Sequence, residues 1–209
     1  MSLLTDTNLK NMICSENTWT DKNKLHIYPF FEDCLTPVGY DLRVGSPYSS
    51  ALKGGTFEIK EGDQIAIIPQ DTVLITTLEE VGMPKDRTIS ALIASKVSKV
   101  SKGLSHISTT IDPDWDGKLL IAIHNHSRDT VNLNFAEPLC TVVFFENKSP
   151  STKGQCNMNS ANSKLGIILN GLNNSLKGRK ENYTHEDTVK SFLQILSKGL
   201  FSMVFMVPN

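Results

Sequence analysis

Between residues 57 and 146 the chain is a succession of short apolar runs separated by turn residues, and this pattern constrains the fold more than any other feature. The runs are Phe57 to Ile59, Ile65 to Ile68, Thr72 to Leu78, Thr88 to Ala94, Leu119 to His124, Thr130 to Phe135 and Leu139 to Phe145. Turn residues such as Glu61-Gly62-Asp63 stand between some of them. Many short strands at nearly regular spacing, without helical patterns between them, predict an all-β barrel or jelly roll.

Two elements are predicted before these runs. Thr5 or Asp6 can cap a short N-terminal helix that places Leu9, Met12 and Ile13 on one face. A strand within residues 36–45 would direct Asp41 and Arg43 to one side, because side chains alternate along a strand. The other side would carry Tyr40, Leu42 and Val44.

Residues 103–125 are interpreted as strand, acidic turn and strand. The turn is Ile111-Asp112-Pro113-Asp114-Trp115-Asp116-Gly117, in which the proline fixes one dihedral angle and the glycine can adopt a positive one. A carboxylate here could activate a water, and the indole could pack against a sugar or a base. The alternative is a solvated acidic hairpin that the tryptophan anchors.

Composition excludes several classes of function. The net charge of −1 gives no chain-wide basic surface, so no nucleic-acid partner is predicted. Cys14, Cys34, Cys140 and Cys156 have no short spacing, which is typical of free thiols in a reducing cytoplasm. The polar residues 1–10 are not a signal peptide.

Motifs of several enzyme classes are missing from the sequence. It has no zinc-deaminase His-x-Glu with Pro-Cys-x-x-Cys, no phosphate loop of the Walker type and no Gly-x-Ser-x-Gly elbow. His124 and His126 have no third ligand nearby in the sequence, so no metal site is predicted.

Residues 94–103 are the basic exception. Serine hydroxyls, lysine charges and backbone amides in this loop could hold a polyphosphate, or the loop could be an ordinary solvated one.

The amino-acid composition changes after Glu146. Residues 149–183, rich in Asn, Ser, Gly and Lys, are predicted to be a connection. Residues 184–209 are predicted to form an apolar C-terminal helix, which either docks on the rest of the chain or meets a partner or a membrane surface. Two lysines and a glutamine within it argue against a membrane span.

Five segments together resemble the dCTP deaminase and dUTPase superfamily. They are residues 2–6, 39–45 and 111–117, the loop 95–104 and the strand 139–146, and the resemblance covers residues 1–148 as one domain. It implies a dUTPase-like β-barrel, a distorted jelly roll, assembled as a homotrimer. It further implies nucleotide sites at subunit interfaces, with Mg²⁺ on the phosphates.

The sequence departs from this pattern in three ways. The deaminase branch has a glutamate on the strand after the acidic turn, and that position is Ala122 here, which cannot transfer a proton. The Arg-Ser-Ser phosphate motif becomes Lys96-Val97-Ser98, and lysine lacks the two-pronged fit of arginine to phosphate. The glycine-rich C-terminal motif of dUTPases is also absent from the sequence.

Two functional hypotheses follow from the resemblance. The first is a hydrolytic protein that handles pyrimidine deoxynucleoside triphosphates, with Asp112 as the base that activates water. Ile111 and Trp115 would shape the base and sugar pocket, while Lys96, Ser98 and Lys102 would bind the phosphates with Mg²⁺. The second is a catalytically degenerate sensor or interaction module that acts through residues 184–209.

Overall fold

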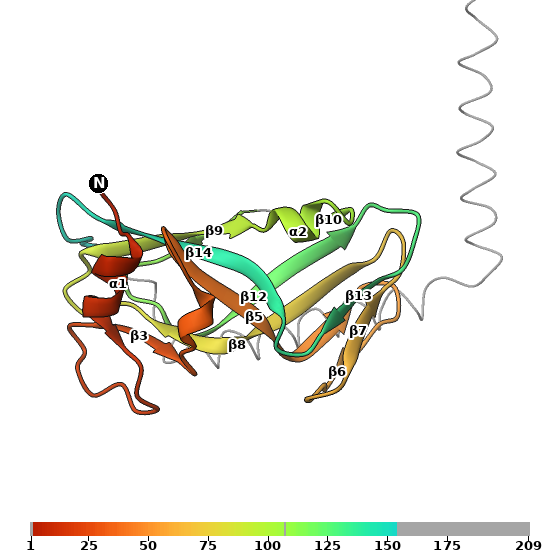
Figure 1. The fold of residues 1–209 in the computed structure, drawn as a ribbon, viewed down its shortest axis with the longest axis horizontal. Helices are drawn as coiled ribbons and strands as arrows, with labels where there is room; N and C mark the ends of the chain where they lie inside the picture. The colour runs from red at the N-terminus through yellow and green to blue at the C-terminus, as the bar shows by residue number, and fades with distance from the viewer. Residues whose placement is uncertain (1, 107, 154–209) are drawn as a thin grey trace, which may run out of the picture.

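The computed structural model describes residues 2–106 and 108–153, and these are almost entirely strands and short connections (Figure 1). The helices are α1 (Asp6–Met12), the 3₁₀ helix η1 (Glu32–Cys34) and α2 (Val97–Val100). The strands are β1 (Ser2–Leu3), β2 (Ile13–Cys14), β3 (Leu25–Tyr28), β4 (Leu35–Thr36), β5 (Gly39–Ser50), β6 (Thr56–Phe57), β7 (Gln64–Ile67), β8 (Thr72–Gly82), β9 (Ile89–Ser95), β10 (Leu104–Ser105), β11 (Thr110–Ile111), β12 (Asp116–Asn125), β13 (Val131–Asn134) and β14 (Pro138–Glu146).

One large sheet organises the described part of the chain. Its main order is β10-β12-β8-β5-β14-β9-β11, and β7 pairs with β13 in a separate ribbon. In Figure 1, α1 and β3 lie at one end of the molecule and β6, β7 and β13 at the other. The terminal strands of the order, β10 and β11, are not paired with each other in the described residues, so the sheet is open. The fold is therefore mainly β and of jelly-roll type, as the pattern of apolar runs predicts.

The alternation of side chains along β12 and β5 places one face of each strand in the core. On β12, Leu119, Ile121 and Ile123 are buried, while the residues between them are half-buried. Three residues of β5 are fully buried in the same core, and they are Tyr40, Leu42 and Val44. The side assignments made from sequence are confirmed for both strands.

The N-terminal helix begins as predicted. Thr5 is the N-cap of α1, its hydroxyl and backbone N–H both bond the Asn8 side chain, and Leu9 is fully buried. Ile13 lies beyond the helix and starts β2, which pairs in parallel with β3. Its side chain still packs against the core, because strand and helix leave it on the same inner surface.

Two predicted strands are shorter or divided in the structure. Residues 104–111, expected as one strand, form β10 on β12 and β11 on β9, because the chain crosses from one end of the sheet order to the other. Of residues 57–59, only Phe57 is in a strand. The backbone N–H of Ile59 instead donates to the Ser46 hydroxyl at 3.1 Å, which ends the pairing of β6.

The remaining expectations concern cysteines and the C-terminal part. Cys14, Cys34 and Cys140 are free and buried, as predicted, whereas Cys156 lies outside the described residues. The helix expected over 184–209 and nearly all of the connection over 149–183 also lie outside them. In the ranges 2–106 and 108–153, no helix has the length and apolarity needed to cross a membrane.

Candidate functional site

The lysine–serine loop is folded as the short helix α2 between β9 and β10, and its lysines face carboxylates of the same chain. Lys96, the N-cap residue, donates a short hydrogen bond from its ammonium group to Asp41 of β5. Asp41 also accepts the Thr141 hydroxyl at 2.6 Å from β14. Both members of the ion pair are largely buried, with side-chain exposures of 22 % for Lys96 and 11 % for Asp41.

The second lysine of α2 repeats this arrangement. Lys99 pairs with Glu137, which directly precedes β14, and its side chain is 12 % exposed. Lys99 was not among the residues predicted to bind phosphate, and its ion pair joins residues 38 positions apart in sequence. Ser98 and Lys102 are exposed on the outside of the loop. Of the three predicted phosphate-binding residues, Lys96 is therefore already ion-paired within the chain.

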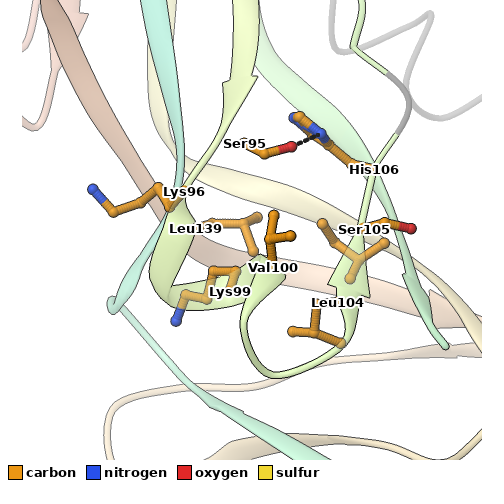
Figure 2. Close-up of a pocket in the computed structure, with 9 residues that line it drawn as sticks. Ser95, Lys96, Lys99, Val100, Leu104, Ser105, His106 and Leu139 are labelled. Atoms are coloured by element: carbon orange, nitrogen blue, oxygen red, sulfur yellow. Dashed lines mark hydrogen bonds between the residues drawn. The ribbon is translucent and has the colours of Figure 1, made fainter. Parts of the chain in front are cut away.

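A small pocket lies on the inner side of α2 (Figure 2). It is lined mainly by Val100, Leu104, Ile123 and Leu139 with the polar Ser95, Ser105 and His106 at its edge, and its empty volume is about 210 Å³, including space open to solvent. Figure 2 shows the ammonium groups of Lys96 and Lys99 directed away from His106, so the pocket receives their aliphatic stems.

His106 lines this pocket together with Lys96 and Lys99. Its Nδ1 lies 3.0 Å from the Ser95 hydroxyl, and its buried Nε2 has no hydrogen-bond partner among the described residues. Burial lowers the pKa of His106 from its ordinary value, because desolvation disfavours the imidazolium. Sequence reasoning missed His106, since a lone histidine on a short apolar segment gives no signal.

The acidic turn forms the bend between β11 and β12, with Trp115 as its anchor. The indole Nε1–H donates to the Gly117 carbonyl at 2.9 Å, and the side chain packs against the core. Gly117 has φ +131°, as the prediction of a positive dihedral requires. Ile111 is 1 % exposed and lies in the core, whereas Asp112 is half-buried. Its neighbour Asp114 lies 3.8 Å from Arg87 in an ion pair.

Within one chain, the acidic bend and the α2 loop lie far apart. Ile111 is opposite Ala91 in the antiparallel pair of β11 and β9, so Asp112 lies about six strand positions from Lys96. At about 3.3 Å per residue this separation is roughly 20 Å. Asp112 and the lysines consequently cannot both contact one water or one phosphate within a single chain.

Ala122 occupies the outer, half-buried face of β12. Leu74 lies opposite it on β8, and Leu120 and His124 flank it along the same face. None of these neighbours is a carboxylic acid, and the titratable group among them is His124, whose Nδ1 lies 2.6 Å from the Thr72 hydroxyl.

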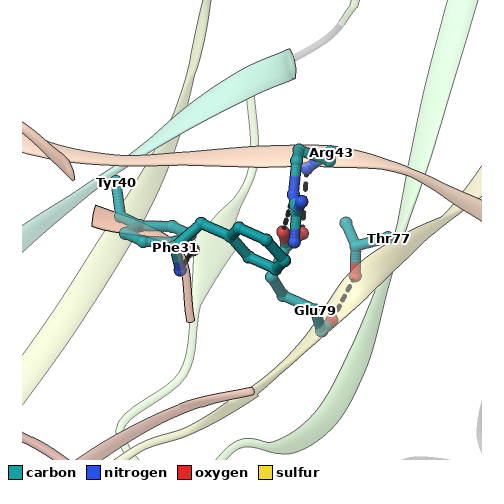
Figure 3. A network of polar contacts seen from close by, with 5 residues as sticks. All are labelled: Phe31, Tyr40, Arg43, Thr77 and Glu79. Atoms are coloured by element: carbon teal, nitrogen blue, oxygen red, sulfur yellow. Dashed lines mark hydrogen bonds and ion pairs between the residues drawn. The ribbon is translucent and has the colours of Figure 1, made fainter. Parts of the chain in front are cut away.

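A buried ion pair that the sequence did not reveal lies on β5 and β8 (Figure 3). The backbone N–H and the Nε of Arg43 donate to the two carboxylate oxygens of Glu79 at 2.9 and 2.6 Å. Phe31 covers the guanidinium at 3.8 Å, and Tyr40 accepts the Phe31 N–H at 2.9 Å. The pair is a structural fixture of the sheet, because Glu79 is fully buried.

Metal ligands do not gather within 2–106 and 108–153, where no group of three or more His, Cys, Asp or Glu side chains could hold an ion. The rings of His124 and His126 have centroids 5.8 Å apart. The Nδ1 of His124 is 2.6 Å from the Thr72 hydroxyl, which occupies that nitrogen.

The open sheet of jelly-roll type, with its lysine-bearing loop and its acidic tryptophan bend, agrees with the dCTP deaminase-like class of proteins. The dCTP deaminase-like family matches residues 4–147, and the chain belongs to it.

Individual relatives agree with this membership. The dCTP deaminase of Thermococcus kodakarensis is 31 % identical over 133 residues, which cover 64 % of this chain and 83 % of the relative. That of Pyrococcus horikoshii is 32 % identical over 132 residues, covering 63 % and 82 %. The crystal structure of 2'-deoxycytidine 5'-triphosphate deaminase from Agrobacterium tumefaciens aligns with a TM-score of 0.54 at 15 % identity. That alignment covers 68 % of this chain and 46 % of the other, and it shows the fold alone.

Proposed function

We propose that this protein handles pyrimidine deoxynucleoside triphosphates and, where it is active, hydrolyses them. Family membership over residues 4–147 supports the substrate class, since relatives at 31 and 32 % identity are named dCTP deaminase. The observation that carries the hydrolytic assignment is the folded acidic bend, which keeps the carboxylate of Asp112 half-buried beside an anchoring Trp115.

The proposed roles follow the chemistry of each group. Asp112 takes a proton from the attacking water, and Trp115 with Ile111 gives the bend the shape against which base and sugar pack. Lys96, Ser98 and Lys102 bind the phosphates. Mg²⁺ arrives with the triphosphate, because it is usually bound by one or two carboxylates together with substrate phosphates. Deamination through a glutamate on β12 is not part of the proposal, because that position is Ala122.

A homotrimer with shared sites is part of the same proposal. Because one chain separates Asp112 from Lys96 by roughly 20 Å, a complete site requires the loop of a second protomer. The outer face of β1, β14 and β9 supports such an assembly: Leu3 lies opposite Phe145 and is 43 % exposed, while Leu92 lies opposite Val143 and is 37 % exposed. Light scattering of the full chain should give the mass of three protomers, and a monomer would refute this part.

A nucleotide-binding sensor without catalysis is the second candidate. Ala122 and the internal pairing of Lys96 favour it, because both weaken groups that the chemistry needs. In this case residues 184–209 would engage a partner or a membrane surface. We propose the cytoplasm for both candidates, where thiols such as the buried Cys140 remain reduced.

One assay separates the candidates. Purified protein with Mg²⁺ is offered dUTP and dCTP, and chromatography resolves the products. Pyrophosphate release that is lost in Asp112→Asn and kept in Asp114→Asn, a matched loss of charge on the same bend, supports the hydrolase. Nucleotide binding without turnover supports the sensor. Absence of both turnover and nucleotide-dependent thermal stabilisation refutes nucleotide handling, and a deaminated product would contradict the interpretation of Ala122.

A further inference from the structure

Two carboxylates form ion pairs with lysines of the α2 loop. Asp41 of β5 contacts the ammonium group of Lys96, and Glu137, directly before β14, contacts that of Lys99. The two negative charges cancel the two positive ones, which leaves the exposed Lys102 as the remaining cation of this loop in the described residues. A phosphate group at α2 would therefore meet one uncompensated positive charge instead of three.

Both carboxylates are held in place by further contacts. Asp41 accepts the Thr141 hydroxyl at 2.6 Å through its second oxygen. Glu137 follows Ala136, whose φ of +61° makes a tight turn, and its second oxygen accepts the Asn134 amide at 3.0 Å. Because neither carboxylate needs to move to reach its lysine, an incoming anion must compete with fixed acceptors and not with water.

We propose that Asp41 and Glu137 determine the specificity of the α2 loop against free polyphosphate by neutralising Lys96 and Lys99. The inference rests on the proposed function in placing phosphate at this loop. It adds the residues that set the strength of that binding. A purely structural role for the two ion pairs would lower stability when they are broken and would leave anion affinity unchanged.

Inorganic tripolyphosphate, without Mg²⁺, is the probe, and calorimetry on the full chain is the measurement. Asp41→Asn and Glu137→Gln keep the size and hydrogen-bonding capacity of each side chain and remove its charge. Each is expected to strengthen tripolyphosphate binding about tenfold, because one repulsive charge near the anion is removed and one lysine is released. The double variant should gain more than either single variant, and Lys96→Met in the Asp41→Asn background should cancel the gain.

Glu146→Gln is the matched control, since it removes the same charge at the exposed opposite end of β14 and should leave affinity unchanged. Thermal melts verify folding, and Glu137→Gln gives an independent result if Asp41→Asn unfolds. Unchanged or weaker tripolyphosphate binding in the folded variants overturns the inference. The proposal of nucleotide handling can fail independently of this one. If tripolyphosphate affinity rises as expected but no variant binds dUTP or dCTP, the specificity role stands and nucleotide handling is refuted.

Discussion

Replacing Arg43 with Met removes the cation that faces the fully buried carboxylate of Glu79, and we expect a large loss of stability. The carboxylate is 0 % exposed, and Arg43 supplies two hydrogen bonds, at 2.9 and 2.6 Å. The Met variant keeps the backbone donor and loses the side-chain donor together with the charge. Methionine keeps most of the aliphatic stem of Arg43 but loses the guanidinium contact with Phe31 at 3.8 Å, so the change removes the charge together with that contact.

The magnitude follows from the geometry. Two unit charges about 4 Å apart attract by about 4 kcal/mol at the effective dielectric constant of about 20 that suits protein sites. Leaving one member of a buried ion pair alone typically costs about 3–5 kcal/mol, whereas replacing both by apolar residues is often close to neutral. Arg43→Met should therefore lower the unfolding free energy by about 4 kcal/mol, and the double variant Arg43→Met with Glu79→Met should recover most of that loss.

The pH dependence gives an independent check on the same residue. Burial raises the pKa of Glu79 despite the opposing effect of Arg43, and removing Arg43 must raise the pKa further. The folded state then binds a proton that the unfolded state releases, so stability of the variant increases as pH falls toward the ordinary carboxyl pKa. Wild type should show a smaller increase over the same range.

Urea denaturation of the full chain at a fixed protomer concentration measures both effects. Lys10→Met is the control, because its ion pair with Glu32 is exposed, at 50 % and 64 %, and its loss should barely move the urea midpoint. If the double variant is as unstable as Arg43→Met, the cost does not come from an uncompensated carboxylate and the reasoning is refuted.

Three further predictions address the glycines, the bend and the pocket. Gly45→Ala should lower the unfolding free energy by at least about 2 kcal/mol, because the new Cβ would lie 2.5 Å from backbone atoms of β8. Gly62→Ala meets no atom within 4 Å and should lower it by about 1 kcal/mol, because alanine disfavours the φ of +89°. Denaturant titration of both variants compares the two losses. Trp115→Phe removes the hydrogen bond to Gly117 and should cost about 1 kcal/mol by thermal unfolding, with nucleotide binding as a second readout. His106 should titrate below its ordinary pKa of 6.5 by NMR, because burial disfavours its charged form. Because the unfolded state then binds more protons than the folded state, the contribution of His106 to stability falls as the pH drops through 6.5.

Local patterns in the sequence were sufficient for most of the fold. Alternation along residues 119–123 predicted which side chains of β12 are buried, and the proline and glycine of the acidic turn predicted the bend. The division of residues 104–111 between two strands was not predictable in the same way. Each piece has only two paired residues, and their partners on β12 and β9 are chosen by the path of the chain across the sheet.

The site was predictable only where its chemistry is local. The serines and lysines of residues 95–102 form one loop, as expected, but the partner of Lys96 is 55 positions away. That contact depends on β9 and β5 both pairing with β14, a long-range arrangement that no short window of sequence encodes. The same is true of Arg43 and Glu79, 36 positions apart, although the alternation along β5 did place Arg43 and Asp41 on one side.

The departures from the resembled pattern concern chemistry and leave packing intact. Ala122 sits on the half-buried outer face of β12, where a small apolar residue is tolerated without disturbing the buried Ile121 and Ile123. Val97 is 84 % exposed on α2, where it adds nothing to the core and offers phosphate no donor from its side chain. Because these two positions carry little folding energy, catalytic groups there can change while the sheet persists. The acidic bend differs, because Trp115 packs against the core and its backbone N–H donates to the Asp112 carbonyl at 3.0 Å. The fold can require this bend without requiring the Asp112 carboxylate, so the comparison of Asp112→Asn with Asp114→Asn measures whether that carboxylate acts in catalysis.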